Sequence, residues 1–180
     1  MTGEIGVGKT TVCEKIAEDA RKTGIKCAGI LTRRFKMKGN VILEVEELST
    51  RERKVLAQKR DDGKIPKGIH ICPYVFDDEA IEFAKATLLK RGELLIIDEV
   101  GPLELRGEGF GDAWKAFEDS GNRNALLVTR NEVKEEFEKL LKRSHETYEV
   151  TNENRDDLPG IILSSLLNQR SGRRKRKAHR

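Results

Sequence analysis

With 180 residues, the chain is long enough to form one domain with a sizeable buried core. Apolar and charged residues each make up 37% of it, and no apolar run reaches the roughly 18 residues that a membrane-spanning helix needs, which excludes a helical membrane protein. The net charge of +4 is unevenly distributed: the last ten residues, SGRRKRKAHR, contain six Lys or Arg and no acid, so the rest of the chain carries a net charge of −2. The three cysteines have no CxxC spacing, and the start of the chain is polar and glycine-rich, so we expect neither a zinc site nor a secretory signal and place the protein in the cytoplasm.

In chain order, the first half of the sequence predicts a helix, a buried strand and two strands of an antiparallel meander at residues 11–23, 25–31, 41–48 and 53–59. The helix carries Val12, Ile16 and Ala20 on one face, and Gly24 provides its end. The segment 41–48 alternates apolar and polar residues, which is typical of a half-exposed antiparallel strand. We expect the meander to extend one edge of the sheet.

In the second half, an irregular segment at 64–76 is followed by alternating helices and strands. The predicted helices begin at Asp77 or Asp78, at Gly111 or Asp112, and near residues 132 and 156, and the predicted strands lie at 94–98, 125–129 and 148–151. Buried strands that alternate with helices predict an α/β fold with a mostly parallel sheet covered on both faces. We expect residues 1–169 to form one domain and residues 170–180 to form a disordered basic tail.

The stretch GEIGVGKT at residues 3–10 has the pattern of a phosphate-binding loop. Its glycines allow backbone N–H groups to approach phosphate oxygens, and the helix that follows directs its positive end at the same place. In such a loop Lys9 reaches the β- and γ-phosphates, and the hydroxyl of Thr10 coordinates Mg²⁺.

A second motif, LLIIDE, ends in two carboxylates, Asp98 and Glu99, at the end of a predicted buried strand. A strand beside the phosphate loop would bring Asp98 to the magnesium ion. Glu99 would orient or activate the attacking water, although a surface position for this acid is the alternative.

Two further stretches contain candidate polar side chains. In GPLELRGEGF, Glu104 is expected near the metal and Arg106 near a phosphate, or both are surface charges. In TNENRDDLP, Asn154 and Arg155 follow the last predicted strand, where loops of doubly wound sheets line the ligand crevice. Helix capping by Asn154 or Asp156 is the alternative.

The sequences TGEIGVGKTT, AGILTRR, IIDEVGPLEL with GEGF, and VTNENRDDLP resemble, in this order and over residues 2–167, the small P-loop nucleoside-triphosphatase family, also called the cancer-related nucleoside-triphosphatases. The resemblance implies a P-loop fold and Mg²⁺-dependent hydrolysis of ATP, GTP and other nucleoside triphosphates to the diphosphate and phosphate. It implies Lys9 and Glu99 as catalytic residues and Thr10 and Asp98 as metal ligands. The candidate nucleotide-binding residues are Gly3, Glu4, Ile5, Gly6, Val7, Gly8, Lys9, Thr10, Thr11, Leu95, Ile96, Ile97, Asp98, Glu99, Val100, Gly101 and Arg155.

The chain departs from this family at its start, where only Met1 and Thr2 precede the loop. The family's loop follows a strand of about six apolar residues. We expect that strand to be central, flanked by the strands at 25–31 and 94–98, and its loss would remove several buried aliphatic side chains at ~2–5 kcal/mol each. We therefore hypothesise that the native protein starts upstream of Met1, and a genome without in-frame apolar codons there would contradict this.

Hydrolysis by P-loop proteins is slow unless an arginine neutralises the charge of the leaving phosphate. Arg33, Arg34, Arg106 and Arg155 are candidates within this chain, and we expect slow turnover by the isolated monomer.

Two other functions remain open. A nucleotide or nucleoside kinase would need an acceptor pocket and a basic lid, for which residues 51–59 are a candidate, although they favour strands. A nucleotide-dependent switch that binds nucleic acid would use the basic tail, which lacks aromatic residues for base stacking, and we favour a solvated tail. The sequence contains no motif that indicates a preferred base.

Overall fold

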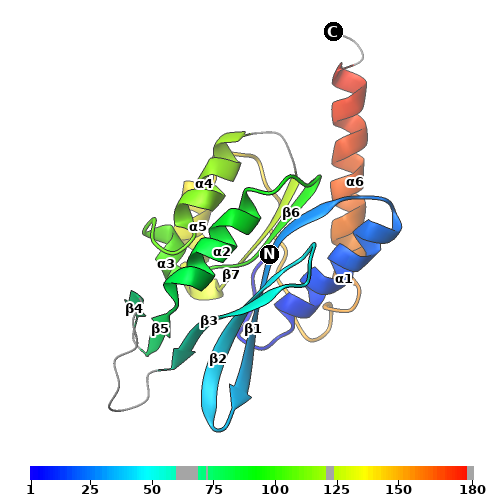
Figure 1. Cartoon of the computed structure of the whole chain (residues 1–180). Coiled ribbons are helices and arrows are strands. Elements are labelled where there is room, and N and C mark those ends of the chain that lie inside the picture. The colour runs from blue at the N-terminus through cyan, green and yellow to red at the C-terminus, as the bar shows by residue number, and fades with distance from the viewer. Residues whose placement is uncertain (60–68, 72, 121–123, 178–180) are drawn as a thin grey trace.

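The core of the molecule is a mixed sheet of seven strands in the order β4-β5-β3-β2-β1-β6-β7, seen in a computed structural model that describes residues 1–59, 69–71, 73–120 and 124–177 (Figure 1). The strands are β1 (Cys27–Met37), β2 (Asn40–Glu47), β3 (Arg53–Lys59), β4 (Ile69–Ile71), β5 (Tyr74–Phe76), β6 (Leu94–Val100) and β7 (Asn124–Thr129). The predicted α/β architecture is confirmed.

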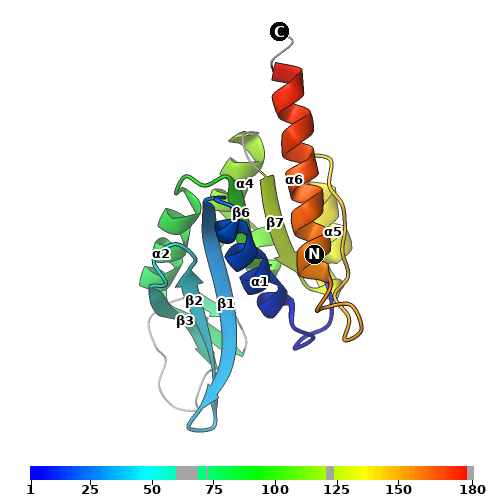
Figure 2. The same cartoon turned by 90° about the vertical axis from the view of Figure 1, so that its right-hand side faces the viewer.

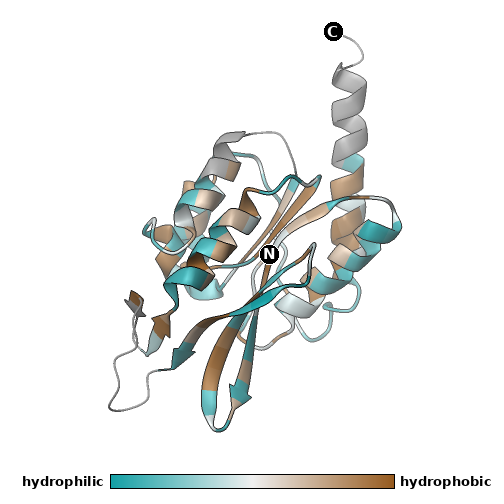
Figure 3. Ribbon diagram, viewed as in Figure 1, coloured by the Kyte–Doolittle hydropathy of each residue, from teal (hydrophilic) through white to brown (hydrophobic). Residues whose placement is uncertain are grey.

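Helices cover both faces of the sheet (Figures 1 and 2). The helices are α1 (Lys9–Lys22), α2 (Asp78–Leu88), α3 (Pro102–Leu105), α4 (Gly111–Ser120), α5 (Lys134–Leu140) and α6 (Leu158–Lys177), with a 3₁₀ turn, η1, at Asn131–Val133. α1 and α6 pack on one face, and α2, α3, α4 and α5 contribute to the core on the other. Figure 3 shows the apolar residues along the central strands and on the part of α6 that packs against them.

β6 shows why a continuous apolar run forms a central strand. Leu94 and Ile96 belong to the core beneath α1 and α6, whereas Leu95 and Ile97 belong to the core on the opposite face. All four are buried, as the apolar run predicts for a strand that is covered on both faces. The parallel pairings of β6 with β1 and with β7 bring Leu31 of β1 and the carboxyl ends of β6 and β7 to the same edge.

The antiparallel part of the sheet is larger than the predicted small meander. β1 continues to Met37 and pairs antiparallel with β2, and β2, β3, β5 and β4 continue the antiparallel pattern. The sheet is therefore mixed rather than mostly parallel. β4 and β5 lie in the stretch 64–76, which was predicted to be irregular. The sequence did not indicate them, because strands of three residues beside Pro73 are too short to show an alternating pattern. Residues 60–68 and 72 of this region lie outside the described residues.

Most predicted helices are confirmed with small changes at their ends. Asp77 caps α2, because its Oδ1 accepts a 2.8 Å hydrogen bond from the backbone N–H of Ala80. Trp114 is buried on α4 and packs against Phe137 of α5. α3 was missed, since a helix of one turn has no measurable period.

The first two residues run between β7 and the segment 148–150. The backbone N–H of Thr129 donates to Met1 O over 3.0 Å, and the N–H of Val150 donates to Thr2 O over 2.9 Å. The predicted neighbours of this position, the strands at 25–31 and 94–98, are wrong, because β1 and β6 pair directly with each other and β7 follows β6. The predicted last strand at 148–151 is reduced to one parallel bridge between Thr2 and Glu149. A strand upstream of Met1 stays a prediction.

The last helix, α6, extends from the body of the molecule (Figures 1 and 2). Leu158, Ile162 and Leu163 are buried against the sheet, whereas Ile161, which was predicted to face inward, is 53% exposed. α6 runs to Lys177 and so includes most of the segment for which disorder was expected. The division at residues 169 and 170 stays a prediction. Among the described helices, none has the length and apolar character that a membrane span requires.

Candidate functional site

The loop at residues 3–10 joins the start of the chain to α1 and wraps around the side chain of Lys9. The ammonium of Lys9 is buried and donates hydrogen bonds to the carbonyl oxygens of Gly3 at 2.6 Å and Glu4 at 2.9 Å. Gly8 adopts a left-handed conformation, with φ of 110°, directly before the first residue of α1. The loop therefore directs its lysine and the positive end of a 14-residue helix to one point, the arrangement that binds phosphate groups.

Gly3 shows why the loop needs glycine where it passes the last part of the chain. Its φ is 145°, and a Cβ added here would lie 2.7 Å from the carbonyl oxygen of Val150. Any larger residue would push the start of the loop away from the segment 148–150.

Thr10 and Asp98 bring the loop and β6 together. The Thr10 hydroxyl donates to Asp98 Oδ2 over 2.6 Å, and Leu31 of β1 pairs with Asp98 in the parallel ladder. Asp98 is 2% exposed, and this burial raises its pKa to about 7 against the opposing effect of the Thr10 hydroxyl. A buried carboxylate next to a hydroxyl oxygen provides two hard oxygen ligands that fit a divalent cation, which would compensate the cost of burying the charge.

Glu99 is held by an arginine that the sequence reasoning missed. Arg130 is the first residue after β7, and its Nε donates to Glu99 Oε1 in a salt bridge. Its neighbour Asn131 accepts a 2.6 Å hydrogen bond from the Thr2 hydroxyl and donates to Glu4 over 3.2 Å. The position of Arg130 directly after a buried parallel strand was the available signal, because such ends line the ligand crevice.

Two of the arginines proposed from the sequence lie on β1. Arg33 is held by Glu14 of α1 and by the fully buried Glu46 of β2, at 3.1 Å from the latter. Arg34 is exposed on the part of β1 that pairs with β2.

Arg155 reaches the phosphate loop, whereas Arg106 does not. A Cβ added to Gly8 would lie 3.4 Å from Cδ of Arg155, so this exposed side chain passes directly over the loop. Arg106 is exposed at the end of α3, and its Nε lies 3.5 Å from Glu108 Oε1.

Two other polar candidates form hydrogen bonds within their own loops. Asn154 accepts from the N–H of Thr151 at 2.8 Å and donates to the carbonyl of Glu149 at 2.9 Å, so its side chain bonds residues that precede it and does not cap α6. Glu104 is buried and accepts a 2.9 Å hydrogen bond from the N–H of Gly101. Burial raises the pKa of Glu104 to about 7, and the nearby charge of Glu99 adds to this effect.

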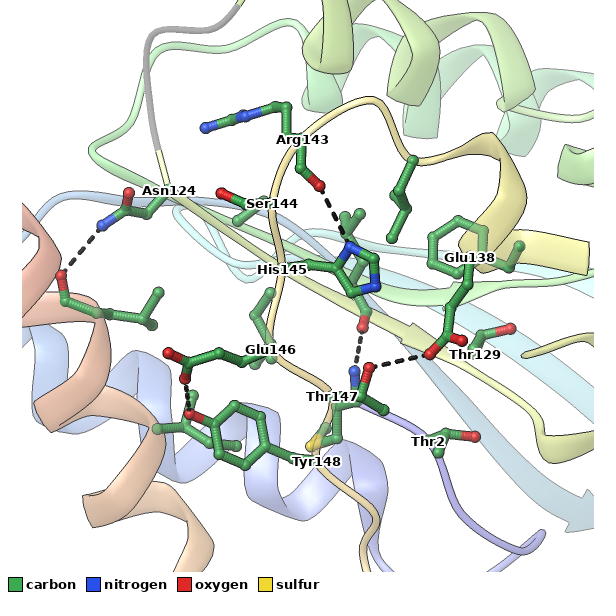
Figure 4. A pocket seen from close by; sticks show the side chains of 18 of the residues that line it. Thr2, Asn124, Thr129, Glu138, Arg143, Ser144, His145, Glu146, Thr147 and Tyr148 are labelled. Atoms are coloured by element: carbon green, nitrogen blue, oxygen red, sulfur yellow. Dashed lines mark hydrogen bonds between the residues drawn. The ribbon is translucent and has the colours of Figure 1, made fainter. Parts of the chain in front are cut away.

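A cavity of about 340 Å³ lies elsewhere, between β7, α5, α6 and the segment 143–148 (Figure 4). Met1 is one of the residues that line it, and the N-terminal amine donates to Leu127 O over 2.8 Å. Figure 4 shows polar pairs along its wall, including Thr147 with Glu138 at 2.9 Å. The described residues that line it include neither the loop 3–10 nor Asp98. The residues with phosphate chemistry therefore form a separate site.

The fold and the loop together define a P-loop nucleotide-binding α/β protein. The model of the family described as NTPase matches residues 1–163. The chain therefore belongs to this NTPase family, and it is a nucleoside triphosphatase.

Similar proteins agree with this assignment over nearly the full length. The nucleoside-triphosphatase THEP1 of Methanocaldococcus jannaschii is 32% identical over 93% of this chain and 95% of its own, and that of Methanosarcina barkeri is 31% identical over 94% and 97%. The crystal structure of THEP1 from the hyperthermophile Aquifex aeolicus has the same fold, with a TM-score of 0.67 over 92% of this chain and 96% of that chain at 23% identity.

Proposed function

We propose that the chain hydrolyses the β–γ phosphoanhydride bond of ATP, GTP and other nucleoside 5′-triphosphates with the help of Mg²⁺, and that the loop at residues 3–10 is its phosphate site. The observation that carries the proposal is the contact between Thr10 and Asp98 beside the buried ammonium of Lys9. It joins a hydroxyl, a carboxylate and a cation at the positive end of α1, where a triphosphate and a divalent cation would meet.

The phosphates are bound mainly by backbone N–H groups of residues 3–11, supported by Lys9. In the free chain the Lys9 ammonium donates to two carbonyl oxygens of its own loop. A phosphate oxygen is a stronger acceptor for a charged donor than a neutral carbonyl is, so we expect Lys9 to exchange these bonds for the β- and γ-phosphates. Arg155, which passes over Gly8, would add a second positive charge from the other side of the loop.

Thr10 and Asp98 are the residues that would hold Mg²⁺, and β6 supplies the rigid support for Asp98 through its buried neighbours Leu95, Ile96 and Ile97. Within the described part of the chain, no three His, Cys, Asp or Glu side chains gather into a metal site. Mg²⁺ usually binds one or two protein oxygens together with substrate phosphates and water, and this pair suits that mode. The ion would neutralise charge that develops on the phosphate oxygens.

Glu99 is the residue that we propose to orient and deprotonate the attacking water. It follows Asp98 on the same strand, and Val100 and Gly101 then direct the chain into α3. The Glu99 side chain is one-fifth exposed and so is accessible to water. Its carboxylate accepts the proton of the water while the oxygen attacks the γ-phosphorus, and the diphosphate leaves with the electron pair of the broken bond.

Location and assembly follow as parts of the same proposal. We propose that the protein works in the cytoplasm as a monomer and that its basic tail is solvated rather than bound to nucleic acid. The basic tail has no aromatic residue on which a base could stack.

Release of phosphate from ATP, GTP, CTP and UTP with and without Mg²⁺ tests the proposal. We expect release from several triphosphates that needs Mg²⁺ and that is lost in Lys9→Ala and Glu99→Gln. Lys22→Ala is the control, because Lys22 lies exposed in the last turn of α1, paired with Asp19 of the same helix at 2.7 Å. Unchanged release by Glu99→Gln would contradict the proposed role of Glu99, and release only on addition of a phosphate acceptor would favour a kinase.

A further inference from the structure

We infer that Arg130 binds the γ-phosphate of a bound nucleoside triphosphate. In the free chain, Arg130 forms its salt bridge with Glu99 instead. The inference rests on the proposed function and deepens it, since it assigns the arginine that neutralises the leaving phosphate to this chain. Arg130 is not among the arginines that the sequence suggested.

The position of Arg130 between the two halves of the site is the first observation. β7 pairs with β6, which ends in Asp98 and Glu99, and the N–H of Thr129 donates to Met1 O just before the phosphate loop. The residue after Thr129 therefore leaves the sheet between the carboxylates and the loop. No long lid is needed to bring its side chain to the phosphates.

The contacts of the next residue connect Arg130 to the loop. Asn131 accepts a hydrogen bond from Thr2 at 2.6 Å and donates one to Glu4 at 3.2 Å. Adjacent residues of one turn thus contact the start of the phosphate loop and the candidate catalytic carboxylate. A shift of Glu4 on phosphate binding would therefore move Asn131 and the turn to which it belongs.

The chemistry of the salt bridge explains how the exchange works. The Glu99–Arg130 pair uses Nε, and a guanidinium has five N–H donors in a planar fork, so it can contact a second anion. The side chains are 20% and 42% exposed, so separating them does not leave a charge in a closed core. A γ-phosphate carries more negative charge than one carboxylate and would attract the guanidinium away from Glu99.

The consequence is a change of partner that prepares the site for hydrolysis. With Arg130 on the γ-phosphate, the Glu99 carboxylate is available to accept the proton of the attacking water. Arg130 then faces the oxygens on which charge accumulates as the β–γ bond breaks. By contrast, Arg33 is engaged by two acids, one of them the fully buried Glu46.

The test compares Arg130→Ala and Arg130→Lys with the control Arg91→Ala, an exposed arginine just before β6, at the end of the strand opposite to Asp98. Turnover, the KM for ATP, and the affinities for Mg²⁺-ADP with and without aluminium fluoride are measured for each. We expect Arg130→Ala to lower kcat by about 10²-fold or more and the affinity for the aluminium fluoride complex by a similar factor. In Arg130→Ala the affinity for ADP should change by less than about threefold. Arg130→Lys should retain part of the kcat that Arg130→Ala loses.

Repeating the comparison in the Glu99→Gln variant shows whether Arg130 contacts the phosphate itself or acts only through the carboxylate of Glu99. In Glu99→Gln, Arg130→Ala should still weaken the aluminium fluoride complex. Loss of that effect in the Gln background would overturn the inference, because Arg130 would then only position Glu99. An unchanged or increased kcat in Arg130→Ala would overturn it as well. Failure of the proposed function is distinguishable, since Lys9→Ala and Glu99→Gln would then retain full phosphate release.

Discussion

The Thr10 hydroxyl donates a 2.6 Å hydrogen bond to Asp98 Oδ2 across 88 positions of sequence. The contact exists because β1 pairs with β6 in parallel, which places the end of β6 beside the first turn of α1. The same hydroxyl lies 3.4 Å from the carbonyl oxygen of Thr32 on β1. Thr10 is thus the point where the loop, the edge of the parallel strands and the buried acid meet.

Thr10→Ala should lower Mg²⁺-dependent phosphate release by about 10²-fold or more, because it removes one of the two oxygen ligands that we propose for the cation. Thr10→Ser keeps the hydroxyl and should retain most of the activity. Titration of phosphate release with Mg²⁺ is the measurement, and the midpoint should rise for the alanine variant. Equal titrations for Ala and Ser would show that the hydroxyl does not bind the metal.

Lys9→Ala should weaken the binding of nucleoside triphosphate by about 10- to 100-fold, the usual value of a hydrogen bond to a charged group. The same variant also removes the hydrogen bonds from Lys9 to Gly3 and Glu4, so the loop should become more mobile in the free protein. Calorimetric titration with a non-hydrolysable triphosphate measures the first effect. Lys22→Ala, which removes an exposed charge from the last turn of the same helix, should bind as the unchanged chain does.

The pH dependence of stability should contain a contribution from Glu104. Burial raises its pKa from the ordinary value to about 7, so the folded chain holds a proton that the unfolded chain has released between about pH 4.5 and 7. The free energy of unfolding therefore falls as the pH rises through this window, by about 3 kcal/mol for this group.

The amide of Glu104→Gln cannot ionise, so this variant should lack the part of the decrease in unfolding free energy that Glu104 contributes. The amide oxygen can still accept the hydrogen bond from the Gly101 N–H. Urea unfolding at pH 5, 6, 7 and 8 measures the effect. The control Glu108→Gln removes an exposed carboxylate four positions further on. Parallel profiles for Glu104→Gln and the unchanged chain would contradict the assignment.

Gly29→Ala should destabilise the fold by more than about 3 kcal/mol, since it combines overpacking with an unfavourable backbone conformation. Gly29 has a φ of 119°, and its added Cβ would lie 1.9 Å from the carbonyl oxygen of Ile96 on β6. The clash would separate the two strands that align Thr10 with Asp98. Thermal and urea unfolding measure the loss.

Gly160→Ala is the matched control for this change. Gly160 lies in α6, and its added Cβ has no atom within 4 Å. Alanine should therefore stabilise the chain by about 0.5–1 kcal/mol through its higher helix propensity. Similar losses in both variants would contradict the close contact of β1 and β6.

The sequence by itself determined the α/β class, most of the elements and the candidate residues of the phosphate site. Periodicity is a local property, so the apolar run of β6 and the apolar face of α1 can be recognised without their partners. The pattern GEIGVGKT is also local, since a loop of glycines followed by Lys9 and Thr10 needs only its own backbone to expose N–H groups to phosphate.

Only the tertiary structure decided which strands are neighbours and which charges pair. It placed β7, rather than β1 and β6, beside Met1 and Thr2. It also paired β7 with β6, which brought Arg130 to Glu99 across 31 positions of sequence. The order of the strands depends on how the apolar faces of all helices and strands are buried together, so no short sequence pattern predicts it. A salt bridge between the ends of two parallel strands depends on that order, which is why Arg130 could be identified as a candidate site residue only in the fold.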